Sequence, residues 1–182
     1  MIMELMSENL IIRNSTFNDC KTFEVWEKKD YVKEFLAIDD SRDYEEVVRE
    51  FILREDDFTN MQFTIVFKKI LIPIGRIYIS HYDECLKSLD ITRIYIGEEE
   101  YIGKGYGKEA MKIILRYAFV NLEMERVTLD TFDGNKRADN LYKELGFVDE
   151  GCARNSIKKN GKYYNLNLKS MLRDEYFSRY IR

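Results

Sequence analysis

The stretch IYIGEEEYIGKGYGKEAMKIILRYAF, residues 94–119, joins an apolar run to a helical pattern through three glycines. Gly103, Gly105 and Gly107 fall within five residues at the mouth of the expected helix. Glycine loses more conformational freedom on folding than any other residue, so a cluster of three needs a physical reason. One reason is a ligand that must approach the backbone closely, and the other is a tight strand-to-helix turn.

Three kinds of ligand loop can be compared with this stretch. A phosphate-binding loop of nucleotide hydrolases needs G-x-x-x-x-G-K-[ST], and Glu98 and Gly105 stand where its first glycine and its final Ser or Thr belong. Residues 105–110 match G-x-G-x-x-A of dinucleotide-binding proteins, but that motif directly follows a strand and EEEYI intervenes here. The third kind binds a pyrophosphate at the free N–H groups of a helix N-terminus, to which Lys104 and Lys108 would add positive charge.

The residues before the glycines predict strands. Residues 61–69, 74–80 and 90–97 are rich in β-branched and aromatic side chains, and their order suggests an antiparallel meander. Pro73 precedes the second of them, where a missing amide donor is tolerable. Toward the N-terminus, residues 9–16 are expected to form a first strand.

Two helices are predicted in the N-terminal third. The first follows Asp19, a candidate cap, and the second begins at Ser41 with acidic residues early and arginines late. Their expected apolar positions are Phe23, Val25 and Trp26 in the first and Val47, Val48, Phe51 and Ile52 in the second.

The residues after the glycines predict a crossover unit. Residues 108–122 have the length and composition of a helix, and a strand at 127–132 follows. We therefore expect residues 94–97 and 127–132 to be parallel neighbours. The expected buried face of this helix carries Ala110, Ile114, Tyr117 and Ala118.

The C-terminal part predicts one more helix and two strands. The helix spans Lys136–Leu145 and ends at Gly146, a natural C-cap, and the strands lie at 146–152 and 163–172. The predicted fold class is α+β: a mixed, largely antiparallel sheet flanked by helices, in one domain of residues 1–182.

Composition restricts the classes of function. The chain is 45% hydrophobic and 34% charged, and its net charge of -4 gives no general electrostatic reason to bind nucleic acid. Cys20, Cys85 and Cys152 are widely spaced, which predicts free thiols in a reducing compartment and no metal site. No leader and no apolar run of about 18 residues is evident, so we expect a cytoplasmic protein without a membrane partner.

The segment YIGEEEYIGKGYGKEA resembles the acetyl-coenzyme A-binding segment of the GCN5-related N-acetyltransferases (GNAT), which has the form R/Q-x-x-G-x-G/A. In that family the loop and the helix N-terminus bind the pyrophosphate, and the preceding strand binds the pantetheine arm. Ile102 departs from the usual Arg or Gln, which leaves the main-chain amides intact and leads us to expect weaker coenzyme affinity. The cofactor-binding residues implied by the resemblance are Ile94, Tyr95, Ile96, Ile102, Gly103, Lys104, Gly105, Tyr106, Gly107 and Lys108.

A second segment, NKRADNLYKELGF at 135–147, is similar to the family signature N-x-x-A-x-x-L-Y-x-x-x-G-F. Asn135 opens a helix and can cap it or reach the coenzyme. In the family the tyrosine at the position of Tyr142 is the usual general acid, which gives a proton to the departing thiolate. The alternative for Tyr142 is a buried tyrosine whose hydroxyl bonds a carbonyl. The upstream segment ENLIIRNSTFNDC and the downstream segment GKYYNLNLKSMLRDEYF resemble the branch of the family that includes ribosomal-protein N-terminal and spermidine acetyltransferases.

The resemblance implies transfer of an acetyl group from acetyl-CoA to a primary amine, by direct attack within a ternary complex. A polyamine, a protein N-terminus and a small-molecule amine remain open as acceptors. The general base is open too: Asp90, a member of the run Glu98 to Glu100 acting through water, and His81 are candidates. An acylated Cys85 or Cys152 is disfavoured, because nothing near either of them in the sequence suggests an activating partner.

Two other classes of function remain as alternatives. The first is a non-catalytic acetyl-CoA-binding sensory module on the same fold, motivated by Ile102 and by the unassigned base. The second is an interaction protein that uses the aromatic residues Tyr176, Phe177 and Tyr180. Those residues are also suited to packing a terminal helix or a homodimer interface.

Overall fold

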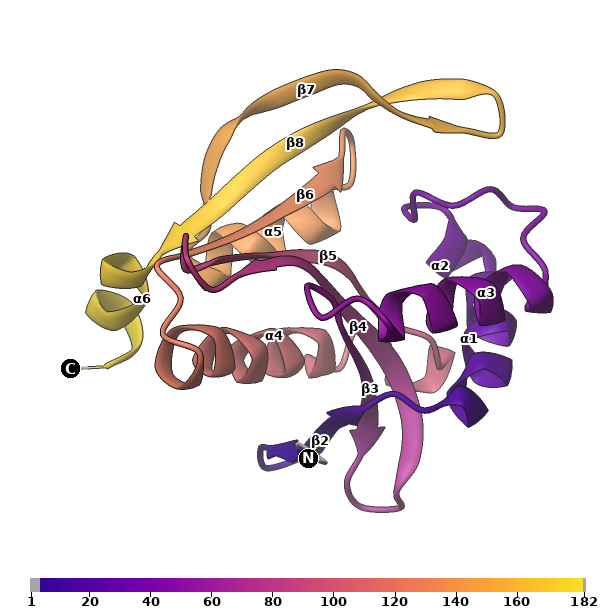
Figure 1. Cartoon of the computed structure of the whole chain (residues 1–182), viewed down its shortest axis with the longest axis horizontal. Coiled ribbons are helices and arrows are strands. Elements are labelled where there is room, and N and C mark those ends of the chain that lie inside the picture. Colours follow the sequence, from indigo (N-terminus) through magenta and orange to yellow (C-terminus); the bar gives the residue numbers. More distant parts are fainter. Residues whose placement is uncertain (1–3, 182) are drawn as a thin grey trace.

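The computed structural model describes residues 4–181, which form one sheet of eight strands in the order β1-β2-β3-β4-β5-β6-β8-β7 (Figure 1). All neighbouring strands are antiparallel except β5 and β6, which are parallel. The mixed, largely antiparallel α+β fold is thus confirmed. The strands are β1 (Glu4–Met6), β2 (Leu10–Asn14), β3 (Met61–Phe67), β4 (Ile72–Asp83), β5 (Ser88–Ile96), β6 (Arg126–Phe132), β7 (Val148–Lys159) and β8 (Lys162–Leu172).

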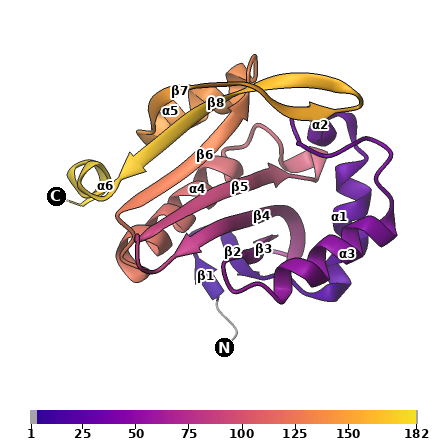
Figure 2. The same cartoon turned by 45° about the horizontal axis from the view of Figure 1, so that its top comes forward.

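Helices cover both faces of the sheet (Figures 1 and 2). On one face α4 packs against β2 and β5 and contacts α5, and on the other face α1 packs against α3. Within residues 4–181 no helix is long and apolar enough to cross a membrane. The helical segments are η1 (Phe17–Asp19), α1 (Cys20–Glu27), α2 (Asp30–Lys33), α3 (Tyr44–Glu55), η2 (Glu99–Tyr101), α4 (Tyr106–Arg116), the π-helical turn η3 (Tyr117–Asn121), α5 (Lys136–Leu145) and α6 (Arg173–Tyr180).

The apolar periodicity of the helices places most of the expected residues in the core. Ala110, Ile114 and Ala118 of the α4 segment are fully buried in the main cluster, between the sheet and α4. A second cluster lies between α1 and α3 and contains Cys20, Phe23, Trp26, Val47 and Phe51. Val25 and Ile52, also expected on the buried faces, are exposed.

The N-terminus of α3 is set by a capping box rather than by the predicted Ser41. Asp43 Oδ1 accepts a hydrogen bond from Glu46 N at 2.9 Å, and Glu46 Oε2 accepts one from Asp43 N at 3.1 Å. This reciprocal pair satisfies two main-chain donors that would otherwise lack partners, so the helix begins at Tyr44.

Two other predicted helix starts differ in detail. Helix α4 begins at Tyr106, two residues before the predicted 108, and its last turn is a π-helix. Asp19 does precede α1, but its carboxylate binds Arg13 and Thr16 instead of an α1 amide. The α5 prediction is confirmed, with Gly146 as its left-handed C-cap at φ 99°.

The predicted parallel pairing of residues 94–97 with 127–132 is wrong in register. Parallel pairs join residues 88–90 of β5 to residues 126–128 of β6, with Asp90 opposite Thr128 as the last pair. Beyond that point β5 remains paired only with β4, and the two parallel strands separate.

A β-bulge in β5 coincides with this separation. Tyr78 of β4 lies opposite Arg93 and Ser80 lies opposite Asp90, so two residues of β5 face the single residue Ile79. A bulge bends the strand and shifts its alternation by one residue. Ile91 and Ile94 therefore both face the α4 side, whereas Arg93 turns toward α1.

Candidate functional site

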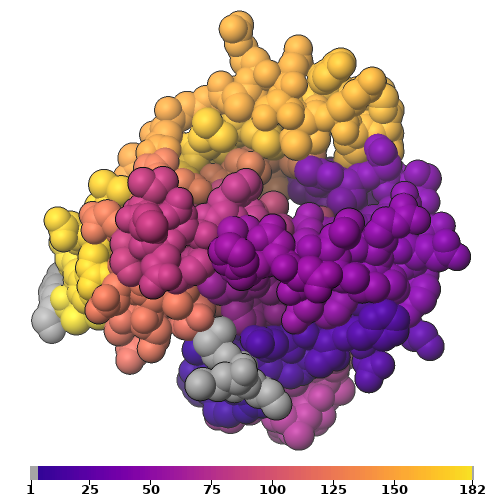
Figure 3. Space-filling model, in the orientation of Figure 1, coloured from indigo at the N-terminus to yellow at the C-terminus, as the bar shows by residue number. Residues whose placement is uncertain are grey.

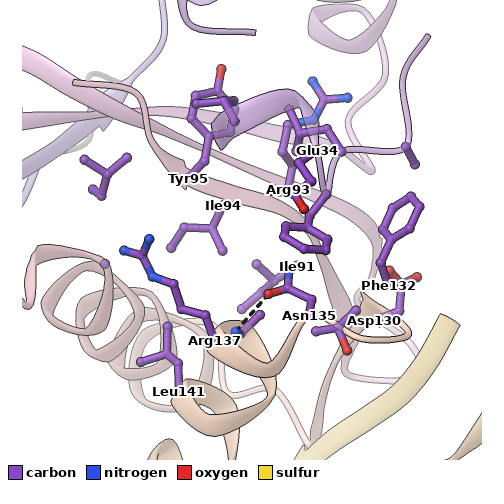
Figure 4. A pocket seen from close by; sticks show the side chains of 18 of the residues that line it. Glu34, Ile91, Arg93, Ile94, Tyr95, Asp130, Phe132, Asn135, Arg137 and Leu141 are labelled. Carbon is purple, nitrogen blue, oxygen red and sulfur yellow. Dashed lines mark hydrogen bonds between the residues drawn. The ribbon is translucent and has the colours of Figure 1, made fainter. Parts of the chain in front are cut away.

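A cavity of about 500 Å³ lies where β5 and β6 separate. Because its lining includes Arg54 of α3 and the first turns of α5, which lie on opposite faces of the sheet, the cavity passes through the gap between the strands. Figure 4 shows Ile94 and Arg137 toward one end of it and Asp130 and Phe132 toward the other. The complete lining consists of Arg54 and residues 31–32, 34–37, 91–96, 102, 107, 130–132, 135, 137–138 and 141–142.

The free edge of β5 lines this cavity. Ile94, Tyr95 and Ile96 pair with β4 on one side, and within residues 4–181 no strand pairs with them on the other. The Tyr95 side chain points away from the cavity, as Figure 4 shows, and its hydroxyl donates to Glu27 Oε1 at 3.1 Å. The predicted strand-edge residues thus offer main-chain groups, and Tyr95 offers no side chain.

Backbone conformation explains why two of the three loop residues are glycines, but it does not explain the third. Gly103 and Gly105 have φ of 77° and 87°, in the left-handed region that favours glycine, so the turn itself accounts for these two. Gly107 lies in the first turn of α4 without such a φ, and a Cβ built there meets no atom within 4 Å. Neither conformation nor packing requires a glycine at 107, and this residue lines the cavity.

The N-terminus of α4 offers main-chain donors. The first helical hydrogen bond runs from Glu109 N to Gly105 O at 3.0 Å. Within residues 4–181 the N–H groups of Tyr106, Gly107 and Lys108 have no acceptor. Together with the positive end of the helix dipole they can bind an anion.

The side chains of the loop have separate roles. Ile102 lines the cavity. Tyr106 packs in an aromatic group with Phe67, its ring centroid 5.4 Å away, and with Tyr101. Lys108 Nζ donates to Glu144 Oε2 at 2.9 Å. Lys104 Nζ lies 5.7 Å from the centre of the Tyr101 ring.

The first turn of α5 contributes one predicted and one unpredicted residue. Asn135 Oδ1 accepts from Ala138 N at 3.1 Å, so Asn135 caps the helix while it also lines the cavity. Arg137 lines the same cavity at the end where Ile94 lies (Figure 4). Sequence reasoning missed Arg137 because it occupies a variable position of the motif.

Tyr142 lines the cavity with its ring buried and packed edge-on against Phe147 at 5.7 Å between centroids. Within the described residues its hydroxyl has no hydrogen-bond partner, in contrast to the alternative of a tyrosine bonded to a carbonyl. Burial raises the pKa of Tyr142, and the nearby Asp130 and Asp139 raise it further. The hydroxyl is therefore protonated at neutral pH and free to donate to a ligand.

Asp130 is a carboxylate in the cavity that the sequence did not single out. It lies on β6 just beyond the last parallel pair, where the strands have separated. Asp130 remains accessible to solvent, and partial desolvation together with the charge of Asp90 raises the pKa of Asp130 to about 6. The signal that could have found it is a lone acidic residue in the otherwise uncharged run VTLDTF.

The general-base candidates named from the sequence lie outside the cavity lining. Asp90 accepts hydrogen bonds from Thr92 Oγ1 and Thr128 Oγ1, both at 2.8 Å. Glu98 accepts from Trp26 Nε1 at 2.7 Å and so helps to hold α1. His81 lies in the exposed hairpin with Nδ1 2.8 Å from Ser80 Oγ.

The three cysteines lie outside the candidate site. Cys85 and Cys152 are exposed and Cys20 is buried in the α1–α3 cluster, and none of the three lines the cavity. Within residues 4–181 no group of three His, Cys, Asp or Glu side chains is placed to hold a metal ion.

The aromatic residues of α6 pack within the chain. Tyr176 stacks on Phe119 with ring centroids 4.8 Å apart, and Tyr180 donates to Leu145 O at 2.7 Å. Phe177 lies edge-on to Tyr176. These contacts attach the terminal helix to α5 and η3.

A group of four arginines and two glutamates, here the arginine cluster, lies between the sheet and α1 and α3, and three of its members, Glu27, Arg76 and Arg93, are buried. Glu27 Oε1 accepts from Arg76 Nη1 at 2.8 Å and lies 3.3 Å from Arg93 Nη1. Glu50 Oε1 lies 2.7 Å from Arg54 Nη2 and 3.3 Å from Arg93 Nη2. The members of the cluster are Glu27, Arg42, Glu50, Arg54, Arg76 and Arg93.

Glu27→Gln is expected to lower the free energy of unfolding by about 3–5 kcal/mol, because it leaves buried arginines without their main counter-charge. Burial alone would raise the pKa of Glu27, but Arg93, Arg76 and Arg42 outweigh it and lower that pKa. A lowered folded-state pKa contributes stability above the unfolded value of about 4.5 and loses it as the pH falls through the folded value. Urea unfolding at several pH values measures both effects.

Glu45→Gln is the matched control, since Glu45 is exposed on α3. We expect it to change stability by no more than about 0.5 kcal/mol. A Glu27→Gln protein as stable as this control would contradict a structural role for the buried carboxylate.

The β7–β8 hairpin contacts the segment that follows α2. Lys159 Nζ donates to Lys33 O and lies 3.4 Å from Asp40 Oδ1, and Asn160 N donates to Asp39 Oδ1 at 2.7 Å. Figure 3 shows the hairpin arching over the molecule toward this N-terminal segment. The hairpin tip thus holds the segment after α2, which supplies residues 34–37 of the cavity lining.

Known proteins resemble this chain along most of its length. The acetyltransferase (GNAT) domain family matches residues 9–148. A spermidine N(1)-acetyltransferase of Vibrio cholerae is 31% identical over 44% of this chain and 46% of its own length. A Bacillus subtilis protein provisionally named a ribosomal N-acetyltransferase is 30% identical over 56% and 55%. The chain spans about half the length of these curated relatives.

Solved structures agree with the fold. The crystal structure of spermidine N-acetyltransferase from Vibrio cholerae in complex with CoA and spermine has a TM-score of 0.83 at 20% identity, covering 94% of this chain and 99% of that one. From the domain match and the shared architecture, the chain belongs to the GNAT acetyltransferase family.

Proposed function

We propose that this protein is an N-acetyltransferase that transfers the acetyl group of acetyl-CoA to a primary amine. The observation that carries the proposal is the cavity in the gap between β5 and β6. Among residues 4–181, this cavity joins a strand edge with no partner strand, a helix N-terminus with unpaired N–H groups, and the Tyr142 hydroxyl, which has no hydrogen-bond partner. CoA is bound in the structure of the Vibrio cholerae relative, which supports this choice of co-substrate.

The residues of the cavity suit the parts of acetyl-CoA. The N–H groups at Tyr106, Gly107 and Lys108 bind the pyrophosphate, and the edge at Ile94, Tyr95 and Ile96 binds the pantetheine arm. Arg137, at the same end as Ile94, supplies the side-chain cation that Ile102 does not. Lys104 lies between Gly103 and Gly105 in the loop before α4, and Asn135 caps the N-terminus of α5.

The chemistry follows from two of the titratable groups that line the cavity, Asp130 and Tyr142. The neutral amine attacks the carbonyl carbon of the thioester, so that a C–N bond forms and the C–S bond breaks. Asp130 accepts the proton lost by nitrogen, directly or through water, and Tyr142 donates a proton to the leaving sulfur. A main-chain N–H on the free edge of β5 polarises the carbonyl oxygen. Tyr142 recovers its proton from Asp130 through solvent, so the products are an amide and free CoA.

The direct test combines coenzyme binding with product formation. Isothermal titration with acetyl-CoA should show binding, and a panel of primary amines should release free thiol. If the coenzyme binds and no amine reacts, the protein is a non-catalytic acetyl-CoA-binding module. If acetyl-CoA fails to bind at millimolar concentration, both functions are wrong.

Gly107→Ala is expected to weaken acetyl-CoA binding without weakening the fold. The new methyl group meets no protein atom within 4 Å, and alanine is the better helix former, so stability should stay equal or rise by up to about 1 kcal/mol. The same methyl group enters the space through which the pyrophosphate approaches, at a steric cost of about 1–3 kcal/mol, which raises Kd by about five- to 150-fold. Calorimetric titration and thermal unfolding measure the two effects.

Lys112→Ala, on the exposed side of α4, is the control for this experiment. It should leave Kd for acetyl-CoA unchanged. An unaltered Kd in Gly107→Ala would show that the coenzyme does not approach α4 at this residue.

A further inference from the structure

The arginine cluster has an excess of two positive charges, because four arginines face two glutamates. Burial, together with the charge of Arg93, lowers the pKa of Arg54 to about 10. Arg54 Nη1 is also buried without a hydrogen-bond partner among the described residues. Glu27 Oε2 and Glu50 Oε1 are likewise buried without a hydrogen-bond partner among the described residues. What the cluster lacks is therefore negative charge.

Two members of the cluster, Arg54 and Arg93, line the cavity. Arg93 follows the β5 bulge and faces the α1 and α3 side of the sheet, opposite to the α4 N-terminus. Arg54 comes from α3 on that same side, and its guanidinium stacks on the Tyr78 ring at 3.6 Å. This is the side from which an amine enters if acetyl-CoA occupies the α4 side, as in the proposed function.

The cavity lining also contains two negatively charged side chains, Asp130 and Glu34. Asp130 lies on β6 near Tyr142, which it influences electrostatically, and is assigned to the amine nitrogen. Glu34 is exposed at the end of α2. A molecule with one amine and one acidic group matches this arrangement, whereas a polyamine would place a second ammonium group against Arg54 and Arg93.

The size of the cavity, about 500 Å³, favours a small molecule, and the β7–β8 hairpin holds one part of its wall. The tip residues Lys159 and Asn160 bind the segment 33–40 on the side where residues 34–37 line the cavity. The hairpin therefore fixes the segment that carries residues 34–37 of the cavity wall.

We propose that the acceptor is a small primary amine that also carries an acidic group, a carboxylate or a phosphate, which Arg54 and Arg93 bind. The proposal rests on the acetyltransferase function inferred above and names its substrate class. It separates this protein from relatives that are named spermidine acetyltransferases.

The test uses matched pairs of amines that differ only in the acidic group. Phenylalanine is compared with phenethylamine, β-alanine with ethylamine, and phosphoethanolamine with ethanolamine, with spermidine as the polycation. We expect kcat/KM to be about 10- to 100-fold higher for the acidic member of at least one pair, and lowest for spermidine. The carboxylate and phosphate pairs distinguish the two acidic groups.

Arg54→Gln should reduce that preference by about 10- to 100-fold through a higher KM for the acidic amine, with little change for its neutral partner. Arg54→Lys keeps the charge and should keep most of the preference, so a folding defect in the first variant would not hide the effect. Arg49→Gln, on the exposed side of α3, is the control.

The outcomes separate this inference from the function beneath it. If spermidine or the neutral amines are preferred and Arg54→Gln changes nothing, the acidic-amine proposal is overturned and the acetyltransferase function stands. If acetyl-CoA binds and no amine of the panel reacts, the acetyltransferase function is overturned and the acceptor proposal with it.

Discussion

Tyr142→Phe is expected to lower kcat for acetyl transfer by about 100- to 10,000-fold, the usual contribution of a positioned general acid. The hydroxyl of Tyr142 has no partner among the described residues, so its removal leaves no protein group unsatisfied. The phenyl ring keeps its edge-on contact with Phe147, so the fold and the Kd for acetyl-CoA should be unchanged. Single-turnover thiol release under saturating acetyl-CoA measures the effect.

Tyr163→Phe removes a phenol from the exposed part of the hairpin and serves as the control. It should retain wild-type kcat. Equal rates for Tyr142→Phe and wild type, with the best amine, would show that the departing sulfur takes its proton from elsewhere.

Asp130→Asn is expected to lower kcat/KM by about 100- to 10,000-fold at pH 7.5, because the amide cannot accept the proton of the attacking amine. With the pKa of Asp130 raised to about 6, the wild-type kcat/KM should rise with pH through about 6 as the carboxyl ionises. The pH profile of kcat/KM for Asp130→Asn should lack this acid limb, that is, the rise through about pH 6. Measurement of kcat/KM between pH 5 and 9 separates loss of the base from a general loss of activity.

The stability of Asp130→Asn should be equal to or higher than that of wild type at neutral pH. A folded-state pKa above the unfolded value of 3.8 means that ionisation of Asp130 opposes folding above that value, and asparagine removes this opposition. Asp133→Asn changes an exposed carboxylate three residues away and is the control. An acid limb that persists in Asp130→Asn would assign the base to another group.

Much of the fold could be predicted from local patterns. The period-two strands, the capped helix Lys136–Leu145 with Gly146 and the glycine turn before α4 all depend on residues within a few positions of each other. Val25 and Ile52 show the limit of this reasoning, because a helical pattern does not say which apolar side chain a neighbouring element will cover.

Site residues that belong to a contiguous sequence motif could be predicted, whereas residues that only folding brings into the site could not. Some of the residues that the two motifs indicated line one cavity, and others do not. The lining contains Ile94, Tyr95, Ile96, Ile102, Gly107, Asn135 and Tyr142, but not Gly103, Lys104, Gly105, Tyr106 or Lys108. Asp130 and Arg137 also line it and have no signature of their own. The wrong strand register for residues 94–97 hid the opening between β5 and β6 from which Asp130 faces the cavity.

The sequence by itself determined the order of elements, the left-handed turn at Gly103 and Gly105, and the phenol on the α5 face, because these depend on backbone preferences and spacing along a few residues. Only the tertiary structure decided that β5 bulges opposite Ile79 and parts from β6 after Asp90. It also decided that Arg54 and Arg93, 39 positions apart in the chain, share one cavity. Strand pairing and the balance of buried charge depend on contacts between distant segments, which no local pattern contains.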